Sequence, residues 1–315
     1  MECWLETWDG RRLRLPQVLE WTFRYGVGTP CDSFSLSCLW DGTEIESLRD
    51  AVGFAAAEGE ERRFTGVLDE AEAVWDENGA RLFLHGRGMA ALLLDNEAEG
   101  ADYQIATVEE ILRDHVSPYG IRTVGGNDMA PVPGFSVETG SSEWAVLYAF
   151  ARYHHGVEPW FDVAGRLHLD GWKEGARRTV DGGSPVCALR WSEKRYGVLS
   201  EVLVRDRSGG RREQVHNGTF AARGGRRRKV LTLPQKSGYE TMRYSGAYQI
   251  ARSAEEEETC TLRLAQLFAA QVGDLLELRL DQPALGGCWR VHSCETGSGP
   301  EGAYTELELR GRERA

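Results

Sequence analysis

Short runs that alternate apolar and polar residues dominate the first hundred positions of the chain. Such alternation, interrupted by Gly, Pro, Asp and Asn, is typical of strands with one buried face. A further run, "GFAAAEGEERRF" (53–64), reads as an edge strand entering the hairpin that turns at Asn78-Gly79. This pattern predicts a small β-barrel or sandwich. The predicted strands are 5–8, 12–16, 18–25, 32–40, 62–75 and 80–86.

The pattern changes to helical spacing after residue 97. Thr107 and Glu110 have the spacing of a capping box, in which each side chain accepts a hydrogen bond from the backbone amide of the other residue. A helix is predicted from there until Pro118 and Gly120. A second, well buried helix should start at Ser141 or Ser142 and close at Gly156.

Two alternating strands follow within 159–172, around an Ala164-Gly165 turn. They complete an α+β unit. The pattern from residue 176 onward is β again, with a hairpin over 196–218 turning at Ser208-Gly209-Gly210 and an imperfect helix at 236–258 that contains Gly246. Four terminal strands are predicted at 258–264, 274–280, 288–294 and 303–311. No internal repeat is visible in the residues.

These elements predict an α+β, mainly β fold of three domains. A first barrel-like domain would span 1–97, an α+β insert 98–175, and a second barrel-like domain with a helix 176–315. A chain of 315 residues with 41% hydrophobic residues can build several cores. Its net charge of −12 disfavours nonspecific binding to nucleic acid or anionic membranes.

Targeting signals and cysteines bear on where the protein is found. The N-terminus lacks an apolar signal segment and no run approaches 18 apolar residues, so we expect synthesis in the cytoplasm and no membrane insertion. The seven cysteines include no C-x-x-C pair, which favours reduced thiols buried in strands.

One short motif invites a nucleotide-binding interpretation. Gly86-x-Gly88-x-x-Ala91 follows an apolar strand, as in a dinucleotide-binding βαβ unit. The helix after it ends by about Leu94, and the strand before it belongs to an antiparallel hairpin. We therefore expect no cofactor, and expect the glycines to let the chain turn sharply off a barrel strand.

The remaining candidate groups form no catalytic constellation. His154 and His155 lie next to each other at a helix C-terminus, where contact with free carbonyls is more plausible than metal binding. Carboxylates cluster at Asp69, Glu70 and Glu72 and over 255–258, but sequence alone shows no pair across a cleft. The basic run 223–229 reads as a solvated loop or a contact for an acidic neighbour. We predict no catalytic, cofactor or metal residues.

Ten tryptophans make a carbohydrate-binding surface conceivable, although their alternation favours barrel interiors or seams between domains. The tryptophans concerned are Trp21, Trp40, Trp75, Trp160 and Trp289. A carbohydrate-active enzyme or lectin, and a nucleotide-dependent enzyme, are the two alternative hypotheses.

The order of these parts resembles the baseplate hub proteins of contractile phage tails, including Mu-type and T-even hubs and late control D proteins. The matching segments are "RRFTGVLDEAEAVWDENGARLFLHGRG", "ATVEEILRDHVSPYGI", "WAVLYAFARYHHGVEPWFDVAGRLHL" and the closing "VGDLLELRL…GCWRVHSCETG…AYTELELRG". They cover most of residues 60–310 in order, and residues 1–60 and 206–240 match least clearly.

The resemblance implies a non-enzymatic, structural role. Such hubs form homotrimers with two barrel-like tube domains per chain, giving a ring that joins the hexameric tail tube to a trimeric spike. Expected partners are other copies of the chain, the tube, the spike and other baseplate proteins, with DNA only as passing cargo. The protein would assemble in the bacterial cytoplasm and then reside in the tail particle, with an acidic channel that does not hold DNA.

Overall fold

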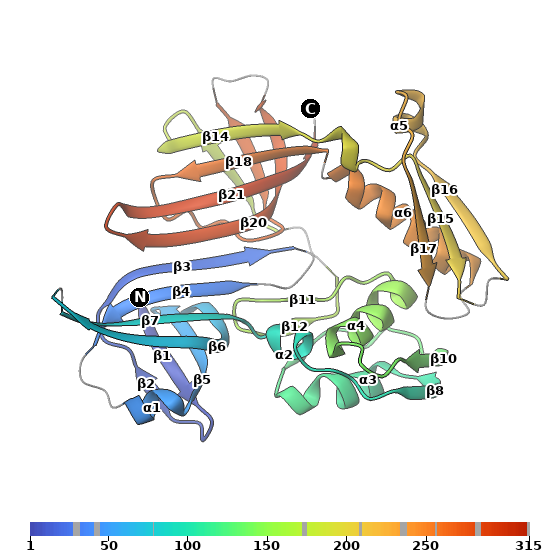
Figure 1. Cartoon of the computed structure of the whole chain (residues 1–315). Coiled ribbons are helices and arrows are strands. Elements are labelled where there is room, and N and C mark those ends of the chain that lie inside the picture. The colour runs from blue at the N-terminus through green and yellow to red at the C-terminus, as the bar shows by residue number, and fades with distance from the viewer. Residues whose placement is uncertain are drawn as a thin grey trace.

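The computed structural model describes residues 1–27, 32–40, 45–77, 79–171, 175–207, 210–233, 238–255, 257–280 and 285–313. Strands hold 51% of these described residues and helices 20%, which confirms the mainly β, α+β class. The main sheet contains strands from both the N-terminal and the C-terminal parts of the chain (Figure 1). Its strand path stays open, and no barrel closes among the described residues. No described helix has the length and apolar content needed to cross a membrane.

The N-terminal half supplies seven strands of this sheet, together with one short helix. In chain order these are β1 (Glu2–Thr7), β2 (Arg12–Arg14), β3 (Val18–Gly26), β4 (Ser33–Leu39), α1 (Ile45–Arg49), β5 (Ala51–Glu58), β6 (Glu61–Asp76) and β7 (Gly79–Gly88). Their spatial order is β3-β4-β7-β6-β5-β1-β2. Four phenylalanines, Phe23, Phe34, Phe54 and Phe64, fill the core between them.

All six strands predicted from alternation in this half are present. The interpretation of 53–64 as an edge strand was wrong, because β5 pairs with β1 on one side and with β6 on the other. The edge position belongs to β2, which pairs only with β1. The predicted turn residue Asn78 lies outside the described residues, while Gly79 has the positive φ of 100° that such a turn requires.

The middle of the chain folds into an α+β unit. Its elements are α2 (Ala91–Leu94), β8 (Ala101–Ala106), α3 (Val108–His115), β9 (Thr123–Val124), β10 (Val132–Val137), α4 (Glu143–Tyr148), β11 (Trp160–Phe161) and β12 (Leu167–His168). The predicted capping box is present, since the Glu110 amide donates to Thr107 and the Thr107 amide donates to Glu110. Ser142 caps α4, which continues as a π-helical turn over Ala149–His154.

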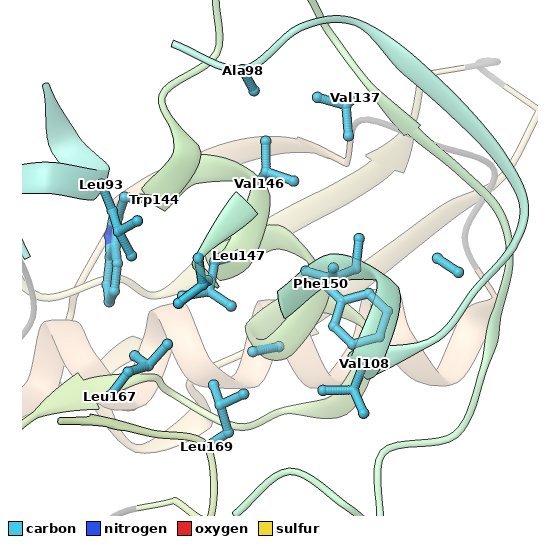
Figure 2. Packing of buried hydrophobic residues seen from close by; sticks show 14 of the residues in the cluster. Leu93, Ala98, Val108, Val137, Trp144, Val146, Leu147, Phe150, Leu167 and Leu169 are labelled. Atoms are coloured by element: carbon cyan, nitrogen blue, oxygen red, sulfur yellow. The ribbon is translucent and has the colours of Figure 1, made fainter. Parts of the chain in front are cut away.

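Helices and strands of this unit share one apolar core, in which Leu147, Phe150 and Leu167 are fully buried (Figure 2). A polar network crosses its edge. His115 Nδ1 lies 2.6 Å from Glu143 Oε2, and Tyr119 donates to the other oxygen of Glu143 at 3.0 Å. His115 Nε2 lies 3.1 Å from the hydroxyl of Tyr103. These contacts fasten α3 to α4 and β8.

The C-terminal half contains six strands of the main sheet and a small inserted unit. The sheet strands are β13 (Arg177–Asp181), β14 (Val186–Glu193), β18 (Glu258–Leu264), β19 (Leu275–Arg279), β20 (Gly287–Gly299) and β21 (Gly302–Glu313). The four predicted terminal strands are therefore confirmed. The inserted unit contains β15 (Glu201–Asp206), β16 (Arg212–His216), α5 (Gly218–Ala222), β17 (Arg228–Leu233) and α6 (Tyr239–Glu255).

In the inserted unit, α6 packs on β15 and β16. Gly246 makes this contact close, because a Cβ there would lie 2.6 Å from Val215 Cγ2. The predicted hairpin over 196–218 is present as β15 and β16. Two residues of its predicted tip, Ser208 and Gly209, lie outside the described residues.

The two halves of the sheet have the same strand arrangement, although the residues at corresponding positions differ. The order β3-β4-β7-β6-β5 corresponds to β14-β18-β21-β20-β19. The first strand of each arrangement has a register shift near its start. The shift lies between Val18 and Glu20 on β3 and between Val186 and Ala188 on β14.

The long hairpins of the two halves also correspond. Each hairpin has a register shift at the corresponding place, between Leu68 and Glu70 on β6 and between Val291 and Ser293 on β20, and β20 has a second shift between Cys288 and Arg290. Each hairpin turns through a glycine of nearly equal φ, Gly79 at 100° and Gly302 at 102°. The inserted unit lies between β14 and β18, whereas only six residues separate β3 from β4 in the sequence.

Candidate assembly interface

The two repeats are joined edge to edge by β3 and β20 (Figure 1). The strands are antiparallel, and Arg24 is the Cα partner of Glu295 while Phe23 is that of Thr296. The hydroxyls of Thr22 and Tyr304 lie 3.3 Å apart across this joint. The result is a continuous path of eight strands, β14-β18-β21-β20-β3-β4-β7-β6, before the sheet turns into β5.

This joint exists because β20 is longer than its neighbour β19. Residues Gly287–Arg290 pair with β19, and the later residues 293–298 extend beyond it and accept β3 on the same side. The strand β6 has the same design. Its residues 61–67 pair with β5, and residues 68–76 extend beyond β5 with only β7 beside them.

Along this eight-strand path, two strand edges therefore remain without a partner strand among the described residues. One is the outer edge of β14, which pairs only with β18, and the other is the extension 68–76 of β6. Unpaired edges of this kind present free backbone N–H and C=O groups and are templates for strand addition. By the repeat, β14 corresponds to β3 and the extension of β6 corresponds to the pairing segment of β20.

Large apolar side chains are exposed at both edges. Trp75 on β6 is 58% exposed and Trp191 on β14 is 45% exposed. Charges at the edges are of opposite sign. The β6 extension carries Glu70 and Glu72, whereas the β14 edge carries Arg190 and then Lys194 just after the strand. None of these four charged side chains has an ion-pair partner within the part of the chain that the structure describes.

The sheet face opposite the two cores is mainly polar along this path, with Phe83 and Val74 among its apolar members. Serines and threonines alternate with the buried residues of β4 and β18. Carboxylates and guanidinium groups are interspersed on the same face, including Arg263 paired with Glu306 at 3.3 Å. The acidic members are Glu20, Glu70, Glu72, Glu295, Glu306 and Glu308, and the basic members are Arg24, Arg81, Arg87, Arg190, Arg263 and Arg310.

A cavity of about 690 Å³ lies at the seam where both repeats meet the hairpin β11–β12. Trp21 and Trp160 line it, so the prediction of tryptophans at seams holds for these two residues. Trp289 is fully buried in the C-terminal core, whereas Trp75 is exposed and packs edge-on against Trp40. At the cavity wall, burial raises the pKa of Asp32 to about 7.

The glycines of the candidate nucleotide motif serve strand packing. β7 is antiparallel to both neighbours and α2 has only four residues, so no dinucleotide-binding unit exists here. A Cβ on Gly86 would lie 2.0 Å from the carbonyl oxygen of Val67 and 2.5 Å from the ring of Phe34. Gly86 and Gly88 lie within the strand, so close approach of strands, rather than a sharp turn, explains Gly86.

The other candidate residues are dispersed. His154 packs edge-on against Phe135, and burial lowers its pKa to about 4, which favours the neutral imidazole. Among the described residues no cluster of His, Cys, Asp or Glu could hold a metal ion. Four of the six described cysteines are buried, and Cys187 is exposed.

The charged clusters lie in two different places. Asp69 pairs with Arg87 at 2.8 Å, and Glu70 and Glu72 belong to the unpaired extension of β6. The basic run 223–229 partly forms β17, where Arg228 pairs with Glu201 at 2.7 Å. Most basic side chains of that run therefore have hydrogen-bond or ion-pair partners within the inserted unit. Sequence reasoning missed the assembly edges, because Arg190 lies in β14, a strand that alternation did not reveal, and Lys194 directly follows that strand.

Comparison with known proteins finds the same fold in phage tail proteins. No protein-family model matches the sequence, and no curated protein matches it. The tail protein from Neisseria meningitidis MC58 superposes with a TM-score of 0.77 at 15% identity, over 98% of this chain and 96% of that one. The prophage MuSo2 43 kDa tail protein from Shewanella oneidensis gives 0.75 at 16% identity, over 98% of each chain.

A more distant match is an Escherichia coli component of the type VI secretion system, described as structurally similar to the T4 bacteriophage tail proteins gp27 and gp5. It has a TM-score of 0.57 at 14% identity, over 95% of this chain and 74% of that one. At these identities the comparisons establish a shared fold. The chain has the fold of phage tail proteins.

Proposed function

We propose that this protein is a structural baseplate hub of a contractile phage tail or a related injection particle. Three copies would form a ring that joins the hexameric tail tube to a trimeric spike. The observation that carries the proposal is the joint between β3 and β20, which links two equivalent units edge to edge within one chain. A unit that joins edge to edge with an equivalent unit can be repeated around a closed ring.

Symmetry explains why two repeats per chain are useful at such a position. Three chains with two equivalent units each present six similar units, which matches a six-fold tube on one side while remaining a three-fold object on the other. The fold shared with phage tail proteins over 98% of this chain supports this role. The division into two tube domains, 1–97 and 176–315, with the insert 98–175 between them, belongs to this proposal.

The polar face of the eight-strand path would line the channel of the ring. The apolar faces of both halves already pack on their own cores, which leaves the polar face for water. Because carboxylates and guanidinium groups alternate on it, the channel would be polar and nearly balanced in charge, in place of the acidic channel expected from composition. Passing DNA would meet few unpaired cations, and phosphate contacts depend on such cations.

The proposed role is non-enzymatic, and the expected partners are further copies, the tube, the spike and other baseplate proteins. The protein would act in the tail particle after assembly in the bacterial cytoplasm. A carbohydrate-active enzyme or lectin is the weaker alternative. The exposed Trp75 packs against Trp40 at a strand edge and forms no open aromatic platform with it.

Native mass tests this proposal, measured on the purified chain alone and after co-expression with the tube and spike proteins of its particle. We expect a trimer of about three times 35.1 kDa that appears in negative-stain images as a ring with a central hole. A chain that stays monomeric beside both partners would contradict the hub role.

A further inference from the structure

The geometry points to one specific joint between copies: we propose that β14 of one copy adds to the extension 68–76 of β6 of the next copy, antiparallel and in a defined register. The inference rests on the proposed ring, and it names the strands and side chains that close that ring. It follows from the repeat, because β14 corresponds to β3 and the extension of β6 corresponds to the pairing segment of β20.

The internal joint fixes the register. Across it, Arg24 faces Glu295 and Phe23 faces Thr296. The matched bulges align Glu295 with Glu72 and align Arg24 with Ser192. Transferring the pairs one by one gives the partners across the new joint. They are Glu70 with Lys194, Ala71 with Glu193, Glu72 with Ser192, Ala73 with Trp191, Val74 with Arg190, and Trp75 with Leu189.

The side chains on the polar face suit this register. Glu70 lies directly opposite Lys194, so two charges without ion-pair partners among the described residues would neutralise each other. Arg190 would lie diagonally from Glu72, within reach of a long side chain. The signs repeat those of the internal joint, where the cation Arg24 is on β3 and the carboxylate Glu295 is on β20.

The apolar face also fits. The exposed Trp191 would lie over the small side chain of Ala73, and the exposed Trp75 would lie against Leu189. Directly opposed apolar pairs on one sheet face contribute to strand pairing. Both exposed tryptophans would then be covered by the contact that also pairs the free backbone groups. A shift of the register by one residue would place one of these tryptophans opposite a charged side chain, either Trp191 opposite Glu72 or Trp75 opposite Arg190.

Cysteine cross-linking of the chain purified together with its tube and spike proteins tests this register. Glu72→Cys and Ser192→Cys are combined in one chain, with Cys187→Ser to remove the thiol that is exposed among the described cysteines. Directly opposed residues of an antiparallel pair have Cα atoms about 4.5–5.5 Å apart, which a disulfide can bridge. The matched control is Val74→Cys with Ser192→Cys, whose diagonal separation of about 7–8 Å is too long.

We expect mild oxidation to give disulfide-linked dimers and trimers with the first pair, ending at the trimer, and almost none with the control. A native trimer in which only the control pair cross-links, or neither pair does, overturns this joint and leaves the hub role standing. Linkage that continues beyond the trimer keeps the joint and contradicts the three-copy ring. A chain that stays monomeric beside its partners overturns both proposals.

Charge reversal gives a second readout that does not need cysteines. Lys194→Glu alone, or Glu70→Lys alone, places like charges opposite each other, and we expect association to weaken by up to about fivefold at each joint. The double variant restores an opposite-charge pair at every joint, so its association should return to the original level at low salt. If the double variant is as weak as the two single changes together, Glu70 and Lys194 do not face each other.

Discussion

Arg24 on β3 and Glu295 on β20 are directly opposed across the joint between the two repeats. The two residues are 271 positions apart in sequence, yet they lie on neighbouring strands of one sheet. Glu295 also accepts a hydrogen bond of 2.9 Å from Tyr304. The first and last parts of the chain are thus joined edge to edge in one sheet. The contact that we propose between copies has the same strand arrangement as this contact within the chain.

Reversing the charge of Arg24 tests the internal joint. Arg24→Glu should lower the free energy of unfolding by up to about 1 kcal/mol, because like charges directly opposite on a sheet are destabilising. Arg24→Glu combined with Glu295→Arg should recover most of the loss. Urea unfolding followed by tryptophan fluorescence measures both, and equal losses in the single and double variants would argue against the pairing.

Gly86 is predicted to tolerate no side chain. Gly86→Ala places a Cβ against the carbonyl of Val67 and the ring of Phe34, and should cost about 1–3 kcal/mol or more, as overpacked cores do. Gly182→Ala is the control, because a Cβ there meets nothing within 4 Å. Thermal unfolding of the two variants should separate them clearly; similar midpoints would contradict the close strand approach.

The network around Glu143 should matter for the middle unit. His115→Leu leaves the buried carboxyl of Glu143 with only the Tyr119 hydroxyl as its side-chain partner, and an uncompensated buried acid costs about 3–5 kcal/mol. Tyr119→Phe removes one hydrogen bond and should cost about 1 kcal/mol. Limited proteolysis of the middle unit and unfolding curves report the difference. A Tyr119 variant as damaged as the His115 variant would contradict this ranking.

His154 should make the fold sensitive to mild acid. Burial lowers its pKa to about 4, below the ordinary value of 6.5. Its neutral form therefore favours the folded state, so this stability is complete above about pH 6.5 and is lost as the pH falls toward 4. The partly buried His292 acts in the same direction. His154→Phe should lose less stability than the natural chain between about pH 7 and pH 5, measured by thermal unfolding; an equal loss would refute the assignment.

Local chemistry determined which elements the sequence could predict. Strict alternation identified β3, β4, β6 and β7, and the capping box at Thr107 located the start of α3, because these signals depend on neighbouring residues. The interior position of β5 could not be predicted, since its second partner β1 lies some 50 residues earlier in the chain.

The repeat escaped detection for a related reason. It is conserved in register and in the position of bulges, whereas corresponding residues such as Phe34 and Cys260 share only their burial. The candidate site depends on that register. Asp69, Glu70 and Glu72 were visible in the sequence as a carboxylate cluster, but their position beside an unpaired strand edge required the structure.

The most direct test of the account is a cryo-electron microscopy reconstruction of the assembled hub, computed without imposed symmetry. We expect three copies around a channel, with β14 of each copy hydrogen-bonded to residues 68–76 of the next, so that the joint between copies repeats the joint between β3 and β20. A reconstruction in which the β14 edge faces solvent, or pairs with a different protein, would contradict the claim that this chain continues its own sheet from copy to copy.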